Sequence, residues 1–339
     1  MKISSILALP LFVCLSYQAQ AQAQSQETFR IAVIGKTKND SFYEQSFQGC
    51  EKFASSHSEV KCLYGGPEFF QDIREQAIVT RAMIDDGLDA ILISTTDSGH
   101  LVSDALKLAK DQQIPVITFD SDLLPEHRQY RLAYVGTDNF EFGVALGNYA
   151  KRYKQQKNTQ VCIQSGNKST PNLDERIKGV RFSLSGKNDN TRLAGSNGWT
   201  EFARCPFYNS GKREMALNQL ELLLKASVPM YIAVAGFAQF SPEYIQRIGP
   251  YKSQIVSHET VIISADTETL QLDALKQQLS TVNVGQRPFE MGRLGTELLY
   301  DYLKYGHKPP QEFYYLGFHT CTSENVDTCT ASDGPMADQ

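Results

Sequence analysis

Six histidines and many carboxylates supply the side chains from which an active site or a metal site could be built. The histidines are His57, His100, His127, His258, His307 and His319. None of them belongs to a His-Glu-x-x-His helix, and the chain contains neither a Gly-x-Ser-x-Gly nucleophile elbow nor a glycine-rich phosphate loop. Because these residue types follow no common catalytic pattern, we expect neither enzymatic activity nor a cofactor.

The first residues have the pattern of a secretory signal peptide. Lys2 is followed by an apolar stretch, residues 3–15, and by small residues spaced as cleavage sites at Ala19, Ala21 and Ala23. The apolar stretch is shorter than the roughly 20 residues of a membrane-spanning helix. A cysteine-lipidation site at Cys14 is the alternative, but Val13 is bulky for the position before a modified cysteine. We therefore expect residues 1–23 to be cleaved and the protein to be periplasmic.

Cysteine number agrees with export. Cys14 leaves with the signal peptide, and the six that remain are Cys50, Cys62, Cys162, Cys205, Cys321 and Cys329. An even number of cysteines in an oxidising compartment predicts disulfides, and pairing of nearest neighbours is the simplest of the 15 possible connectivities. Zinc is the alternative, but no Cys-x-x-Cys pair or histidine cluster has ligand spacing, so we expect no metal.

Composition excludes two further classes of protein. The net charge of −5 and the content of 21% charged residues lack the basic excess of a nucleic-acid-binding domain. No second apolar run of spanning length follows Ser25, so we expect a chain that does not span a membrane. About 315 residues remain after cleavage, enough for two domains of ordinary size.

Short apolar runs alternate with stretches of helical periodicity, which is typical of parallel sheets flanked by helices. The expected strands are residues 30–34, 60–64, 90–93, 115–119, 133–135, 160–164, 200–205, 230–235 and 261–263. The expected helices are residues 42–55, 72–86, 99–112, 173–184, 212–226 and 267–278. The two series predict two similar α/β lobes, with a crossover near residues 136–138. Ligands of such sheets bind beyond the carboxyl ends of the strands.

Several short motifs occur in a fixed order along most of the mature chain. They are Phe42-Tyr43, Gly87-Leu-Asp-Ala-Ile-Leu-Ile-Ser94, Ile114-Pro-Val-Ile-Thr-Phe-Asp120, Gly136-Thr-Asp-Asn139, Glu175-Arg-Ile-Lys-Gly179 and Val284-Gly-Gln-Arg-Pro-Phe-Glu-Met-Gly292. In these motifs the chain resembles the ribose-type family of periplasmic sugar-binding proteins, whose type I fold is shared with the effector domains of lac-type repressors. No helix-turn-helix precedes the fold, which disfavours the repressor branch.

The resemblance implies two Rossmann-like lobes joined by a three-strand hinge, with the ligand held between them as the lobes close. The chain is expected to cross between lobes near Thr137, after Gln286 and near Leu316. The N-terminal lobe would then comprise residues 24–136 and 287–315, and the C-terminal lobe residues 137–286 and 316–339. The family also places the strands of Cys162 and Cys205 side by side, so we predict the pairs Cys50–Cys62, Cys162–Cys205 and Cys321–Cys329.

Residues that match the family's ligand contacts form the expected site. Asp120 would accept hydrogen bonds from sugar hydroxyls and Arg176 would donate them; a helix cap and a surface ion pair are the alternative roles. Asp266 and Gln286 match later polar contacts. Phe42 and Tyr43 match an aromatic pair that stacks on sugar C–H faces, although core packing would also explain them. Looser matches are Asn39, Ser94 and Tyr208.

Two departures from the family pattern bear on the ligand. Ser121 follows Asp120 where relatives often carry arginine, and residues 235–240 lack an asparagine followed by an acidic residue, placing apolar side chains there. A standard ribose pocket is therefore not expected. The ligand could be another sugar, a modified sugar or a small signalling molecule.

Three functions are compatible with these residues. The first is a monomeric solute-binding protein that presents a sugar-like ligand to an inner-membrane ABC permease. The second is a sensory receptor that presents the ligand to the periplasmic domain of a histidine kinase or to a chemoreceptor. A secreted glycosidase that uses Asp120 and Asp266 is the distant third, because the family uses these positions to bind sugar without cleaving it.

Overall fold

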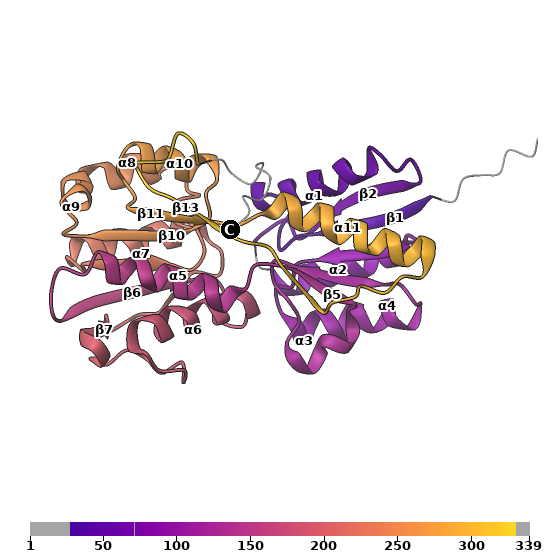
Figure 1. Ribbon diagram of the computed structural model, residues 1–339, viewed down its shortest axis with the longest axis horizontal. Helices are drawn as coiled ribbons and strands as arrows, with labels where there is room; N and C mark the ends of the chain where they lie inside the picture. Colours follow the sequence, from indigo (N-terminus) through magenta and orange to yellow (C-terminus); the bar gives the residue numbers. More distant parts are fainter. Residues whose placement is uncertain (1–27, 71, 330–339) are drawn as a thin grey trace, which may run out of the picture.

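The computed structural model describes residues 28–70 and 72–329, which form two α/β lobes side by side (Figure 1). The expected signal peptide and the last ten residues of the expected C-terminal lobe lie outside the described residues. Each lobe is built on its own sheet, one of six strands and one of seven. No helix among the described residues is long and apolar enough to cross a membrane.

The N-terminal lobe has an all-parallel sheet in the order β12-β5-β4-β3-β1-β2. Its strands are β1 (Phe29–Ile34), β2 (Val60–Gly65), β3 (Ala90–Ile93), β4 (Val116–Phe119), β5 (Ala133–Gly136) and β12 (Phe313–Tyr315). Its helices are α1 (Ser41–Ala54), α2 (Ile73–Asp85), α3 (Ser98–Leu101), α4 (Lys107–Asp111) and α11 (Pro288–Tyr305), with a π-helical turn at Val102–Leu106 and a 3-10 turn at Pro125–Tyr130.

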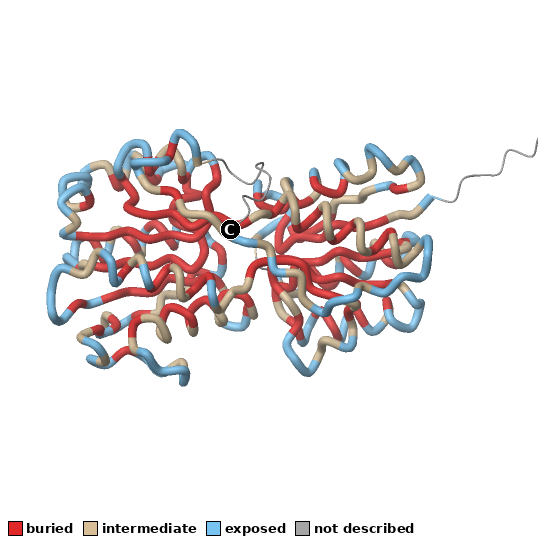
Figure 2. The backbone as a smooth tube through the Cα atoms, viewed as in Figure 1, coloured by how far each residue is buried: buried red, intermediate tan, exposed pale blue. Residues whose placement is uncertain are grey.

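Alternate residues of these strands face opposite layers of helices. Ile31 and Val33 of β1 belong to the core under α1 and α11, whereas Ala32 and Ile34 belong to the core under α2 to α4. The central strands are therefore buried on both faces, and this explains their continuous apolar runs. Figure 2 shows these strands in the colour of buried residues.

The C-terminal lobe repeats the plan with the sheet order β13-β11-β10-β9-β6-β7, and β8 also pairs with β6. Its strands are β6 (Thr159–Ser165), β7 (Trp199–Glu201), β8 (Phe207–Tyr208), β9 (Met230–Ala233), β10 (Val261–Ala265), β11 (Val282–Gly285) and the antiparallel β13 (His319–Cys321). Its helices are α5 (Asn139–Arg152), α6 (Pro171–Ser185), α7 (Arg213–Lys225), α8 (Tyr244–Ile248), α9 (Lys252–Val256) and α10 (Thr269–Lys276), with 3-10 turns at Ser196–Gly198 and Gly249–Tyr251.

The chain passes between the two sheets three times. It leaves the first sheet after β5, returns to the first lobe after β11 through α11, and crosses again between β12 and β13. These connections lie beside Thr137, Gln286 and Leu316. They bring three strand ends to the boundary between the lobes.

The expected α/β architecture is confirmed, and the differences are local. The strand expected at residues 200–205 ends at Glu201, because the chain then bends away before Cys205 and Pro206. The helix expected at residues 99–112 is divided by the π-helical turn. Helices α5 and α11 were not among the expected helices.

Candidate ligand-binding site

Two aspartates occupy equivalent positions in the two lobes, directly after β4 and β10. Asp120 and Asp266 both have left-handed backbone conformations, with φ of 56° and 71°. Their N–H groups donate to Val135 on β5 at 3.3 Å and to Val284 on β11 at 2.7 Å. A left-handed conformation is uncommon outside glycine, and here it turns the chain at two matching strand ends.

Asp120 is the centre of the polar contacts in the cleft. Its Oδ2 accepts hydrogen bonds from Ser94 Oγ at 2.7 Å and from the Tyr43 hydroxyl at 3.2 Å, and Lys36 Nζ lies 3.1 Å away. Its Oδ1 accepts from Asn172 Nδ2 at 3.0 Å. Asn172 belongs to the other lobe, so Asp120 is a point at which the two lobes meet.

Charge around Asp120 is balanced by two cations. Lys36 and Asp120 are almost fully buried, with side-chain exposures of 3% and 5%. Burial alone would raise the pKa of Asp120, but Lys36 and Arg176 outweigh it and lower that pKa. Burial also lowers the pKa of Lys36, and pairing with Asp120 opposes the effect. The carboxylate is therefore ionised at neutral pH.

Arg176 is fixed by partners on every side of its guanidinium group. Nε donates to Asn139 Oδ1 at 2.8 Å, Nη1 to the Val234 carbonyl at 2.9 Å and Nη2 to Gln286 Oε1 at 2.7 Å. The guanidinium carbon lies 4.5 Å from the centre of the Phe142 ring. Arg176 Nη2 is also 3.8 Å from Asp120 Oδ1 across the boundary between the lobes.

Gln286 connects the hinge to the second aspartate. It lies directly after β11, where its Oε1 also accepts a hydrogen bond from Thr137 Oγ1 at 3.0 Å. Its Nε2 donates to Asp266 Oδ1 at 2.7 Å. Six buried side chains thus form a continuous row of polar groups across the cleft, called the polar row below: Lys36, Asp120, Asn172, Arg176, Gln286 and Asp266.

Aromatic side chains from both lobes form a second group of residues beside the polar row. Ring centroids are 5.3 Å apart for Phe42 and Tyr43, 6.3 Å for Tyr43 and Phe70, and 4.9 Å for Phe70 and Phe237. Phe240 lies on the same segment as Phe237. These five residues are called the aromatic wall below. Its contact between Phe70 and Phe237 also joins the two lobes.

A cavity lies between the polar row and the aromatic wall. Its lining is drawn from both lobes: Lys36, Asp40, Phe42, Tyr43, Phe70, Asp120, Asn172, Leu173, Arg176, Ala235, Gly236, Phe237, Phe240, Asp266 and Gln286. The lobes are close enough for Lys36 Nζ to donate to Asn172 Oδ1 at 3.0 Å. A ligand held here would replace such direct contacts by contacts through its own polar groups.

Two more contacts join the lobes at the rim of the cavity. Arg213 donates to Asp40 Oδ2 at 3.1 Å, and Gln45 Nε2 donates to both carboxylate oxygens of Glu268 at 3.0 and 2.8 Å. Burial raises the pKa of Asp40 to about 6 and that of Glu268 to about 7. Closure of the lobes thus buries two carboxyl groups that titrate near neutral pH.

The structure brings together most of the residues expected from the sequence. Six of them line this cavity: Asp120, Arg176, Asp266, Gln286, Phe42 and Tyr43. Ser94 does not line the cavity, but its hydroxyl donates a hydrogen bond to Asp120 Oδ2. Asn39 instead donates to Glu68 at the exposed surface, and Tyr208 lines a separate hollow on another side of the lobes' boundary.

Several lining residues were not expected from the sequence. They are Lys36, Asp40, Phe70, Asn172 and Leu173. The segment 235–240, where the sequence placed apolar side chains, contributes Ala235, Gly236, Phe237 and Phe240 to the lining. One available signal was that Lys36 follows the buried first strand almost directly, as Asp120 follows the fourth. The partner of Lys36, Asn172, is 136 residues away, and no local pattern connects them.

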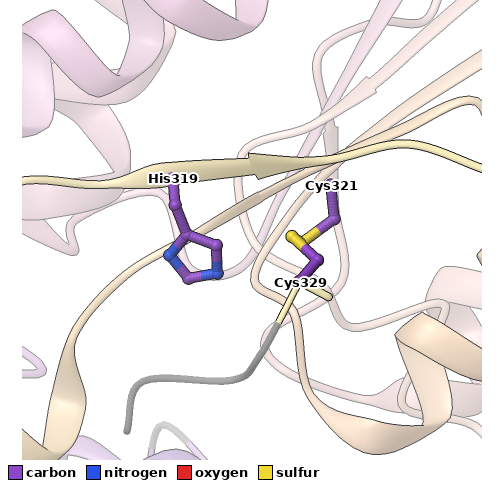
Figure 3. Close-up of side chains that lie close together, drawn as sticks. All are labelled: His319, Cys321 and Cys329. Carbon is purple, nitrogen blue, oxygen red and sulfur yellow. A yellow bond between two sulfur atoms is a disulfide. The ribbon is translucent and has the colours of Figure 1, made fainter. Parts of the chain in front are cut away.

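The six cysteines of the described chain lie in the three expected pairs. Cα separations are 6.1 Å for Cys50 and Cys62, 5.3 Å for Cys162 and Cys205, and 5.7 Å for Cys321 and Cys329. Figure 3 shows the last pair beside His319, with ligand atoms of the three residues within 4.8 Å of one another. A disulfide has no thiolate to offer a metal, so the oxidised pair leaves only the histidine as a donor.

Comparison with known proteins agrees with this geometry. A family model described as "Periplasmic binding protein domain" matches residues 31–308. The chain belongs to this family. A D-ribose/D-allose-binding protein of Pseudomonas aeruginosa is 27% identical over 186 residues, which are 53% of this chain and 57% of that protein. The match thus spans little more than half the length of this curated relative, and the likeness is to the ribose-type sugar-binding branch.

Solved structures of other periplasmic binding proteins share the two-lobe fold. An ABC transporter solute-binding protein from Agrobacterium vitis, bound with α-D-tagatopyranose, has a TM-score of 0.74 and 24% identity over 88% of this chain and 96% of its own. A second A. vitis protein, with bound D-fucose, has a TM-score of 0.73 and 22% identity over 88% and 97%. At these identities the likeness establishes the fold of this periplasmic binding protein.

Proposed function

We propose that this periplasmic binding protein captures a small neutral sugar between its lobes and delivers it to an ABC permease. The observation that carries the proposal is the pairing of the polar row with the aromatic wall around a cavity lined by both lobes. No residue of this set is arranged for bond cleavage, and the homologous proteins are binding proteins, so the proposal includes no catalysis.

The chemistry of the polar row suits hydroxyl groups. A sugar hydroxyl donates one hydrogen bond and accepts others, so it can lie between the Asp120 carboxylate and the donors of Lys36, Asn172 and Arg176. Charge-assisted hydrogen bonds in a dry site are stronger than neutral ones. Because Lys36 and Arg176 balance Asp120 and Asp266, a neutral ligand leaves no charge uncompensated in the cavity.

The aromatic wall suits the other surface of a sugar. The C–H groups of a sugar ring form an apolar face, and aromatic rings such as Phe42 and Tyr43 pack against such faces. One protein similar to this chain is named for D-ribose and D-allose, and two others were solved with bound D-tagatose and D-fucose. All four sugars are neutral monosaccharides. We take a neutral monosaccharide or a derivative of one as the ligand class.

Capture would follow from closure of the hinge. Residues 24–136 and 287–315 would move as one lobe, and residues 137–286 and 316–339 as the other. A ligand that contacts both Asp120 and Arg176 binds the closed state more tightly than the open state and shifts the equilibrium toward closure. The permease would recognise the closed state. Export through a cleaved signal peptide would place the protein in the periplasm.

Identification of the bound ligand tests the proposal. The protein is purified from its native host without denaturation, and native mass spectrometry measures the mass of any ligand that remains bound. Calorimetry with a panel of aldoses, ketoses, deoxy sugars and inositols then measures each Kd. We expect a saccharide with a micromolar Kd or tighter. A panel without any binder, together with a co-purified ligand that is not a sugar, would contradict the proposal.

The downstream partner is tested separately. Permease and ATPase genes beside the gene for this chain would support transport, whereas a gene for a histidine kinase would support a sensory role. Binding of the sugar-loaded protein to the purified permease, measured against the same protein without sugar, gives the direct biochemical answer.

A further inference from the structure

One part of the aromatic wall offers no polar side chain to a ligand. It consists of Phe70 from the N-terminal lobe and of Ala235, Phe237 and Phe240 from the segment after β9. Phe237 and Phe240 are 3% and 7% exposed, so the closed cavity holds them away from water. A ligand atom beside them contacts mainly aromatic carbon, and the Arg213 guanidinium, which lies 5.5 Å from the centre of the Phe240 ring, is paired with Asp40.

The charged groups nearest to this part already have partners. Asp266 accepts hydrogen bonds from Gln286 Nε2 and from the backbone of Gly236. Asp40 accepts from the Phe42 N–H at 3.0 Å and from Arg213. Both carboxylates are therefore engaged by groups of the protein, as Asp120 is, and their contacts with Gly236 and Phe42 hold the wall in position.

The segment that carries the two phenylalanines is a fixed turn. The Gly236 carbonyl accepts hydrogen bonds from the Gln239 N–H at 3.0 Å and from the Phe240 N–H at 3.1 Å. The Gln239 side chain is itself held by Ser280 at 2.8 Å. The apolar surface is therefore preformed in the C-terminal lobe and does not arise from a loose loop.

Contact with the opposite lobe completes this surface. The rings of Phe70 and Phe237 meet edge to face with centroids 4.9 Å apart. Since they come from different lobes, both rings can contact one ligand group only when the lobes are closed. An apolar group packed against both rings would favour the closed state.

Packing of aromatic rings against a C–H face of the sugar does not by itself explain why Phe70, Phe237 and Phe240 have no polar side chain among them. A pyranose ring has two C–H faces, but most carbons of its rim carry a hydroxyl group. A rim hydroxyl beside Phe70 and Phe237 would lose its hydrogen bonds to water and find no side-chain partner in return. A methyl group in the same place loses nothing and is removed from water.

We propose that the ligand is a deoxy sugar, with its ring hydroxyls on the polar row and a methyl group against Phe70, Phe237 and Phe240. The inference rests on the proposed function and narrows its ligand class. An apolar pocket rejects an added hydroxyl by about 100-fold at most. We therefore expect the deoxy member of a matched pair to bind about 10- to 100-fold more tightly than its hydroxylated partner.

Calorimetry on pairs of sugars that differ by one hydroxyl tests the inference. Suitable pairs are D-galactose and D-fucose, L-mannose and L-rhamnose, and D-glucose and 6-deoxy-D-glucose. The pair that contains the tightest binder decides the result. A lower Kd for its deoxy member supports the inference. A lower or equal Kd for the hydroxylated member overturns it and leaves the sugar-binding function intact, whereas no binding by any sugar overturns both.

Variants of Phe237 identify the residue responsible. Phe237→Asn places an amide in the wall and should reduce the preference for the deoxy sugar to less than threefold, while Phe237→Leu keeps the wall apolar and should retain the preference. Phe182→Asn, on α6 and outside the cavity, is the matched control and should also retain it. An unchanged preference in Phe237→Asn would overturn the assignment. Should that variant fail to fold, the ratio in the unmodified protein still decides.

Discussion

Replacement of Asp120 by alanine should weaken sugar binding far more than it weakens the fold. In the closed state Asp120 contacts Ser94, Tyr43 and Lys36 of its own lobe and Asn172 of the other. Its loss removes the acceptor for sugar hydroxyls and leaves the buried Lys36 ammonium without its counter-charge. Both losses are largest when the lobes are closed, because the open cleft admits water to Lys36.

The size of the effect follows from the contacts. Charge-assisted hydrogen bonds contribute about 1.5–3 kcal/mol each, and removal of one partner of a buried ion pair costs about 3–5 kcal/mol. At about 1.4 kcal/mol per factor of ten, a loss of about 3 kcal/mol from the closed state raises Kd about 100-fold. We therefore expect Asp120→Ala to raise Kd by at least about 100-fold, with a smaller loss in the free energy of unfolding.

A double-mutant cycle separates the two causes. Lys36→Met removes the stranded charge while keeping an extended side chain, so the double variant Asp120→Ala/Lys36→Met should lose less affinity than the two single variants together. Asp122→Ala is the matched control, since Asp122 pairs with Arg131 at 2.7 Å and does not line the cavity. Calorimetry gives the Kd values and urea denaturation the stability. An Asp120→Ala Kd within threefold of the unmodified protein, or strictly additive effects, would refute the reasoning.

Three further results are expected. The closed state should take up a proton as the pH falls through about 7, because Glu268 has its pKa raised from 4.5 to that value by burial. This stabilisation of closure is lost as the pH rises, so Kd should be at least about tenfold lower at pH 6 than at pH 8. Glu268→Gln should reduce the difference to about twofold, because burial also raises the pKa of Asp40 to about 6. A pH-independent Kd in the unmodified protein would speak against burial of Glu268 on closure. Peptide mapping without reduction should recover the links Cys50–Cys62, Cys162–Cys205 and Cys321–Cys329, and free thiols or a link between lobes would reject this pairing. A sugar at 100 times its Kd should add about 2.7 kcal/mol to the native state and raise Tm, whereas an unchanged Tm would exclude specific binding to the folded protein.

The sequence predicted the buried strands more completely than the helices. Buried parallel strands are continuous apolar runs, and those of β1, β3 and β4 could be recognised without further information. In two closely packed helix pairs, α5 with α6 and α1 with α11, the sequence predicted α6 and α1 but not α5 and α11. All four helices contain a glycine at the contact, although glycine lowers helix propensity by about 1 kcal/mol relative to alanine. These glycines are required by packing, since a Cβ at Gly143 would overlap the backbone of Arg176 and one at Gly292 that of Ser46.

The candidate site was predictable where a residue matches the family pattern. Asp120 and Asp266 follow strands, Arg176 and Phe42 lie on helices, and the structure places all four on one cavity. Asn172 and Phe70 match no such pattern, because their roles depend on how the two lobes approach each other. Asn39 lies in the first loop beside these residues, but Glu68 engages it at the surface. The roles of Asn172, Phe70 and Asn39 depend on contacts between segments that are distant in the sequence, and no local pattern shows such contacts.

Capture of sugar by closure of the lobes is tested most directly by a distance between them. Spin labels at two exposed positions, Glu126 of the N-terminal lobe and Lys187 of the C-terminal lobe, allow that distance to be measured by pulsed electron resonance with and without the tightest-binding sugar. The account predicts one shorter and narrower distance distribution with sugar, and no such change in Arg176→Ala at the same sugar concentration. A sugar that binds with micromolar Kd while the distance distribution stays unchanged would contradict it.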